Sequence, residues 1–145
     1  MIFTENKISD AVTFSIGAAG YSMLEIVWRG HTHWSMALAG GICLVGLKKI
    51  PGLMPKKNLI SKAAAGSMLI TSVEFLFGLV FNVLLKKEVW DYSNMPFNID
   101  GQICLLYSFL WMLLCIAIIP LIEKINKADI KGDFIGLFKK NLGGN

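Results

Sequence analysis

Apolar residues fall in four long runs along the 145-residue chain, separated by shorter polar segments. The runs are Ala11–Trp28, Gly30–Leu47, Ala63–Leu85 and Gln102–Ile122. A helix needs about 20 apolar residues to cross a hydrocarbon core of about 30 Å. The pattern therefore predicts an all-α integral membrane protein, a four-helix bundle of two antiparallel transmembrane hairpins. A very apolar soluble bundle is the alternative, but runs of this length seldom occur together in soluble folds.

The predicted spans cover residues 11–29, 33–48, 62–86 and 102–122, which makes residues 1–145 a single transmembrane domain. Pro51 and Pro55 are expected to prevent a long helix between the second and third spans. Beyond the last span, Asp133–Leu142 sets Phe, Ile and Leu against lysines. This segment predicts a C-terminal amphipathic helix, over about 131–142, that lies in the membrane interface.

Basic residues gather on one side of the predicted bundle. The N-terminal lead, the segment Lys48–Lys62 and the C-terminal tail share that side, and they hold all but three of the 14 Lys and Arg residues. The positive-inside rule then predicts a multi-pass protein of the cell membrane with both termini cytoplasmic. The net charge of +4 reflects this bias, so membrane lipid is an expected partner and nucleic acid is not.

Polar side chains recur at helical spacing on the first and third runs. Glu25 and Arg29 share one face of the first run with Ser22, and Glu74 shares one face of the third run with Asn82. At 1.5 Å per residue, Glu74 lies roughly 16 Å below the outer end of its run, near the midplane. A carboxyl group at that depth must be protonated, paired or facing a wet cavity. We expect the two polar stripes to face each other.

Arg29 is the one Arg in a chain that otherwise uses Lys as its cation. That choice favours a task that Lys does less well, such as planar bidentate contact with a carboxylate or phosphate. Glu25 precedes Arg29 by four residues, the favourable order for a helical ion pair. The alternative is a purely structural pair that lowers the cost of inserting Glu25 into the membrane.

The segment Trp90–Gly101, between the third and fourth runs, is longer and richer in turn residues than a plain connection needs. We expect it to fold back over the outer mouth of the bundle as a lid, with its aromatic residues and Phe97 covered. Asn98 would provide hydrogen bonds to backbone groups of the lid. Asp91 would reach Arg29 or the nearby histidines.

His31 and His33, with carboxylates as further donors, form a weak pattern for a divalent metal. The alternative is two interfacial histidines that hydrogen-bond the outer loop, with no cofactor. The chain carries no phosphate loop, nucleophile elbow or Gly-rich nucleotide motif, so we expect that it does not itself hydrolyse a nucleotide.

The sequence resembles a known family in two blocks. One is Gly-Tyr-x-x-x-Glu-x-x-x-Arg-Gly-x-Thr-His-Trp-Ser-Met from Gly20, and the other is Trp-Asp-Tyr-Ser-x-x-Pro-x-Asn-x-x-Gly-Gln-Ile-Cys from Trp90, with Glu74 between them. Together they resemble small bacterial membrane proteins described as putative ABC-transporter permeases, type IV. The resemblance covers residues 17–111 and implies a transport role. It also implies a cytoplasmic ATPase partner, for which Lys48–Lys62 is the candidate docking segment.

These observations leave three hypotheses for the function. The first is a transporter or permease-like subunit with an outward-facing polar site; four helices are few for a pathway, so a homo-oligomer or a partner membrane subunit is expected. The second is an intramembrane enzyme, metal-dependent or acid/base, that acts on a lipid-linked substrate. The third is a non-catalytic structural or regulatory subunit. The candidate substrate-binding residues are Glu25, Arg29, Glu74, Asn82, Asp91, Tyr92 and Asn98, with His31 and His33 as metal candidates.

Overall fold

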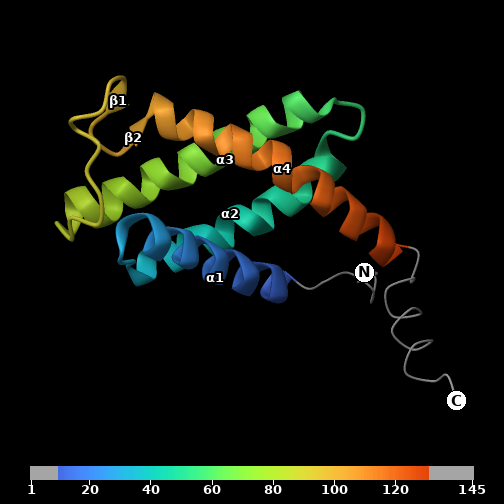
Figure 1. Cartoon of the computed structure of the whole chain (residues 1–145), viewed down its shortest axis with the longest axis horizontal. Coiled ribbons are helices and arrows are strands. Elements are labelled where there is room, and N and C mark those ends of the chain that lie inside the picture. Colours follow the sequence, from blue (N-terminus) through green and yellow to red (C-terminus); the bar gives the residue numbers. More distant parts are fainter. Residues whose placement is uncertain (1–9, 131–145) are drawn as a thin grey trace, which may run out of the picture.

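The structure is a computed structural model, and it describes residues 10–130, with the backbone alone for residues 128–130. The predicted amphipathic helix at about 131–142 lies outside the described residues. Four long helices run up and down as a bundle (Figure 1). They are α1 (Asp10–Arg29), α2 (Trp34–Leu53), α3 (Leu59–Phe77) with its π-helical continuation η1 (Gly78–Leu84), and α4 (Leu105–Ile130). Each of the four is long and apolar enough to cross a membrane, which confirms the predicted fold class.

The helices pair as two hairpins. α1 packs mainly against α2, α3 packs mainly against α4, and α2 joins the two hairpins through α3. The turn over residues 54–58 lies at one end of the bundle, which we call the turn end, together with the start of α1 and the described end of α4 (Figure 1). The opposite end, which we call the loop end, carries the α1–α2 connection and the long loop of residues 85–104.

Small residues hold α1 and α2 together at close range. A Cβ atom at Gly40 would lie 2.4 Å from the Cβ atom of Tyr21 and 2.6 Å from the carbonyl oxygen of Gly17. One at Gly41 would lie 2.5 Å from the ring of Phe14. The backbones therefore approach as closely as they do only because these positions are glycine, the usual device for packing helices in lipid.

Within residues 10–130, the interior has two apolar clusters, one toward each end. The cluster nearer the turn end joins α2, α3 and α4 through residues such as Leu47, Ala63 and Ile119. The cluster at the loop end joins Met36 of α2 to Val89 and Trp90 of the long loop. The long loop is therefore part of the packed structure rather than a free connection.

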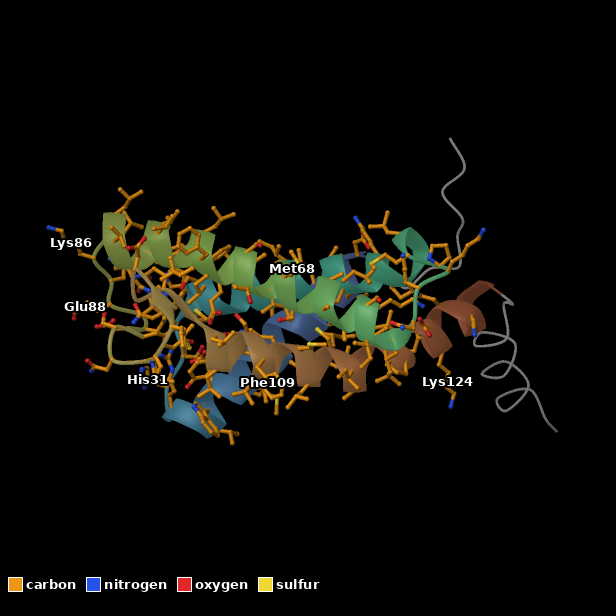
Figure 2. All side chains as sticks on the ribbon, turned by 90° about the horizontal axis from the view of Figure 1, so that it is seen from above. His31, Met68, Lys86, Glu88, Phe109 and Lys124 are labelled. Atoms are coloured by element: carbon orange, nitrogen blue, oxygen red, sulfur yellow. The ribbon has the colours of Figure 1, made fainter. Side chains whose placement is uncertain are left out.

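The outward faces of the helices are apolar. Met68 of α3 and Phe109 of α4 point away from the bundle near its middle, whereas Lys86 and Glu88 lie at one end and Lys124 at the other (Figure 2). Met68 is 71% exposed and Phe109 is 55% exposed. Side chains of this size and exposure are expected where hydrocarbon rather than water surrounds the protein.

The turn end differs from the sequence-based expectation, because α2 continues through Pro51 to Leu53. A proline removes its own N–H donor and obstructs one carbonyl, so α2 can tolerate it within one turn of its end. Three lysines of the segment Lys48–Lys62 take part in ion pairs. Lys48 Nζ lies 3.2 Å from Asp10 Oδ1 and Lys49 Nζ lies 4.0 Å from Asp10 Oδ2. Lys62 pairs with Glu123 of α4.

Candidate functional site

Arg29 ends α1 and connects it to the long loop. Its Nε atom lies 2.5 Å from Oε2 of Glu25, one helical turn earlier. Its Nη1 atom donates a hydrogen bond of 2.8 Å to the carbonyl oxygen of Val89. Because Val89 is buried in the loop-end cluster, Arg29 ties the end of α1 to a fixed part of the loop.

The Glu25–Arg29 pair is incompletely satisfied. Glu25 Oε2 and Arg29 Nε are close enough to attract as charges, but neither has a partner at hydrogen-bond geometry among the described residues. Arg29 Nη2 has no partner within the described chain either, and all three atoms are shielded from solvent. A guanidinium offers five N–H donors, and a buried donor without an acceptor carries a desolvation penalty of about 1–3 kcal/mol. The site therefore retains a capacity to donate hydrogen bonds.

Glu74 lies buried in the middle of the bundle and meets neutral donors rather than a cation. Its Oε1 atom accepts a hydrogen bond of 3.0 Å from the hydroxyl of Tyr92, and its Oε2 atom accepts one of 3.2 Å from Nε1 of Trp111. The two donors come from the long loop and from α4.

The two predicted polar stripes do not pack directly against each other. The stripe on α3 faces α4, where Ser67 Oγ donates 2.6 Å to the carbonyl oxygen of Ser108 and Thr71 Oγ1 lies 2.8 Å from Ser108 Oγ. The stripe on α1 belongs to the other hairpin. Both glutamates nevertheless point into protein, because Glu74 is 5% exposed and the Glu25 side chain is 14% exposed.

A pocket of about 230 Å³ opens at the loop end, between α1 and α4. Its lining includes the charged pair and five aromatic side chains, namely Tyr21, Glu25, Trp28, Arg29, Tyr92, Tyr107 and Trp111. The rings of Tyr92 and Tyr107 stack with centroids 4.7 Å apart, and those of Tyr21 and Trp111 lie 5.8 Å apart. Tyr92 and Trp111 thus line the pocket and also hold Glu74.

Tyr92 is the link between the pocket and Glu74. Burial raises the pKa of Tyr92 well above its usual range, and the charge of Glu74 raises this pKa further. The phenol therefore keeps its proton at physiological pH and remains a donor to Glu74.

Asn82, a predicted site residue, organises the loop rather than the pocket. Its Oδ1 atom accepts hydrogen bonds from the backbone N–H groups of Val89 at 2.7 Å and Trp90 at 3.4 Å. Its Nδ2 atom donates 2.8 Å to Oε1 of Gln102. Nε1 of Trp90 in turn donates 2.8 Å to the carbonyl oxygen of Gln102. These bonds fold the start of the loop onto the bundle.

Asp91 does not reach Arg29 or the histidines, which corrects that expectation. Its Oδ1 atom accepts hydrogen bonds from the backbone N–H of Ser93 at 2.8 Å and from the hydroxyl of Ser93. The side chain of Ser93, and then its backbone, lower the pKa of Asp91 below its usual range. A short carboxylate completes such a turn more readily than it bridges to another element.

Asn98 also acts within the loop. Its Nδ2 atom donates to the carbonyl oxygens of Met95 at 2.8 Å and Ser93 at 3.2 Å, and its Oδ1 atom accepts from the N–H of Gly101 at 3.1 Å. The loop then forms a small hairpin of β1 (Asn98–Ile99) and β2 (Ile103–Cys104). Phe97 lies at the surface of this loop and is 80% exposed, contrary to the expectation that it would be covered.

The histidines lie apart from the pocket lining. His33 caps α2, where its Nδ1 atom lies 2.6 Å from Ser35 Oγ and accepts from the N–H of Ser35 at 3.3 Å. His31 Nδ1 lies 3.1 Å from the carbonyl oxygen of Arg29. Over residues 10–130, no group of three or more His, Cys, Asp or Glu side chains is placed to hold a metal ion.

The sequence pattern did not single out four residues that line the site or organise the loop, namely Tyr21, Tyr107, Trp111 and Gln102. Trp111 offered a signal, because a Trp in the middle of a span, one turn from Ser108, is unlike the Trp residues that mark membrane interfaces. Gln102 was assigned to the fourth span, but α4 begins at Leu105.

The fold and the pocket together define a four-helix membrane protein with an aromatic-lined site, which includes the Glu25–Arg29 pair, at one end of its bundle. The chain belongs to the family described as "Putative ABC-transporter type IV", whose model matches residues 14–140. It is therefore a transporter-like membrane protein. Neither the curated proteins nor the solved structures gave a match to this chain.

Proposed function

We propose that this chain is the membrane subunit of a transport system and that its loop-end pocket receives a small anionic or polar solute. The observation that carries the proposal is Arg29 Nη2, a shielded donor without an acceptor, on a residue that lines the pocket. A solute carboxylate or phosphate would supply the missing acceptor, and the planar guanidinium suits that contact. Family membership supports the transport role.

The pocket faces outward in this proposal. Lys49, Lys56 and Lys57 are exposed at or near the turn end, and the positive-inside rule assigns such a lysine-rich end to the cytoplasm. Both termini are then cytoplasmic as well. Of these lysines, Lys56 and Lys57 form the surface that we propose for a cytoplasmic ATPase, because Lys48, Lys49 and Lys62 already take part in ion pairs within the bundle.

Glu74 is the proposed switchable group behind the pocket. Tyr92 lines the pocket and donates to Glu74, so a solute that moves Tyr92 would change the hydrogen bonding of a buried carboxyl group. Because four helices enclose little space, the pathway would be completed by a second copy or by a partner membrane subunit.

The first test is ligand binding by the purified protein in non-ionic detergent. Thermal unfolding would be followed with inorganic phosphate, sulfate and acetate, since a ligand that binds only the folded state raises the midpoint. We expect an anion-dependent rise in the wild type that is lost in Arg29→Gln. Lys86→Gln is the matched control, because it removes an exposed cation at the same end.

Arg29→Lys tests the geometry without removing the charge, and it should retain only part of the effect. If the anion-dependent rise is equal in the wild type and Arg29→Gln, the pocket is not the site. The solute with the largest effect is then measured for uptake into membrane vesicles that contain the chain and its native partners, with and without ATP. Uptake that is the same without this chain would contradict the transport role.

A further inference from the structure

A groove runs between α1 and α4 along most of the bundle. The loop-end pocket of about 230 Å³ is followed by pockets of about 320 Å³ and 250 Å³ toward the turn end. The first two share Tyr21 and Trp111 in their linings, and the second and third share Ile16 and Ile118. Because α1 packs mainly on α2 and α4 mainly on α3, the space between α1 and α4 stays open on its lipid side.

The groove carries a charged pair at its loop end and is apolar along its middle. Leu44, Ile70 and Leu114 line the middle pocket, which has almost no polar surface. At the loop end stand the Glu25–Arg29 pair and the unpartnered Nη2 donor of Arg29. A donor that lacks an acceptor, placed at the head of a long apolar track, matches the chemistry of an anionic amphiphile.

The length of the groove suits an extended hydrocarbon chain. From Arg29 to Thr13, which lines the last pocket, α1 rises roughly 24 Å, most of the depth of a hydrocarbon core.

We infer that the groove between α1 and α4 holds the hydrocarbon tail of an anionic amphiphile whose headgroup accepts a hydrogen bond from Arg29 Nη2. The inference rests on the proposed function and narrows its substrate class from small anions to amphiphiles. Such a ligand enters sideways from the outer leaflet, with the headgroup at the loop end and the tail along α1. Trp28, which is 75% exposed and lines the loop-end pocket, stands at the level where headgroups meet hydrocarbon.

Gly20 provides a direct test of whether the groove holds a hydrocarbon tail. It lines the middle pocket, and a Cβ atom placed there would meet nothing within 4 Å. Gly20→Leu therefore adds an apolar side chain to the groove from a position where its Cβ atom meets no obstruction. Gly52→Leu is the matched control, because Gly52 also lies in a helix with open space around it and lines none of the three pockets.

The experiment compares three probes by thermal unfolding of the purified chain in non-ionic detergent. Lysophosphatidic acid has a phosphate and one acyl chain, glycerol phosphate lacks the chain, and monoacylglycerol lacks the phosphate. We expect lysophosphatidic acid to bind more tightly than either. Gly20→Leu should weaken its binding roughly tenfold or more, which corresponds to about 1.4 kcal/mol, whereas Gly52→Leu should leave it unchanged. Arg29→Gln should remove the preference for the phosphate.

The outcomes separate this inference from the proposed function. If inorganic phosphate and glycerol phosphate bind as tightly as lysophosphatidic acid, the groove does not bind a hydrocarbon tail. The same conclusion follows if Gly20→Leu binds lysophosphatidic acid as the wild type does. Either result would leave the proposed small-anion pocket unaffected. If no anionic probe binds in an Arg29-dependent manner, both the proposed small-anion pocket and the amphiphile inference are contradicted. If Gly20→Leu instead breaks an oligomer, measured by light scattering, without weakening the binding of the amphiphile, the groove is an interface between copies and the inference is overturned.

Discussion

Tyr92 donates a hydrogen bond of 3.0 Å to Oε1 of Glu74, and this bond joins the long loop to the middle of α3. A loop that would otherwise only connect two helices thereby supplies a partner for a buried carboxyl group. Trp111 supplies the second partner from α4 at 3.2 Å. The middle of the bundle is therefore held by groups from three separate parts of the chain.

Tyr92→Phe should destabilise the folded protein by about 1–3 kcal/mol, because it leaves Glu74 Oε1 buried without a donor. Tyr107→Phe is the matched control, since it removes the hydroxyl of the neighbouring stacked ring. Chemical unfolding in detergent measures both variants. An equal loss in the two would mean that the Tyr92–Glu74 bond does not stabilise the fold.

Glu74→Gln should also destabilise the protein, because an amide has one acceptor oxygen where Tyr92 and Trp111 both donate. In a double-mutant cycle with Tyr92→Phe, the loss in the double variant should be smaller than the sum of the single losses, as expected for residues in one contact. Strictly additive free energies of unfolding would contradict the contact.

Gly40→Ala should separate α1 from α2, because the new methyl group would lie 2.4 Å from the Cβ atom of Tyr21. Overpacking of this kind typically lowers the free energy of unfolding by about 1–3 kcal/mol. Gly20→Ala meets nothing within 4 Å and should be neutral or slightly stabilising, since Ala favours helix over Gly by up to about 1 kcal/mol. Thermal unfolding of the pair distinguishes close packing from a general intolerance of substitution in the membrane.

Asp91→Asn should loosen the loop without affecting the pocket, because Asp91 bonds to Ser93 and not to Arg29. The pKa of Asp91 is lowered in the folded state, so the contribution of its carboxylate is present above the unfolded pKa and is lost as pH falls through the folded value. Amide protection of the loop, corrected for intrinsic exchange rates, should therefore fall at acid pH in the wild type and change less in Asp91→Asn. Asp91→Asn and Arg29→Lys should affect the affinity for anions independently, so the double variant should show the sum of the two free-energy changes. A strong departure from this sum would show that the loop closes over the pocket.

The orientation of the bundle is tested by labelling single cysteines in intact cells. A cysteine that replaces Lys87 at the loop end should react with an impermeant reagent, and one that replaces Lys56 at the turn end should not. Both positions are exposed in the structure, so a difference in labelling reports the side of the membrane. The reverse result would invert the predicted topology.

The sequence determined the class of fold, because four apolar runs of membrane length leave a chain few alternatives in lipid. It also indicated that Glu25, Arg29 and Glu74 avoid lipid, since exposing such groups would be costly. Pro51 misled the prediction of helix ends, because local propensity does not show how far packing carries a helix past one lost hydrogen bond. The apolar runs, the charged residues within them and the proline are all read from short stretches of the chain.

Only the tertiary structure decided which groups meet. The polar faces of α1 and α3 looked complementary, yet Glu74 meets Tyr92 and Trp111, which lie 18 and 37 residues away along the chain. Asp91 appeared placed for Arg29, but a turn with Ser93 satisfies it locally. The groove between α1 and α4 has no counterpart in the sequence, because a gap arises from how two hairpins pack and not from any residue in either of them.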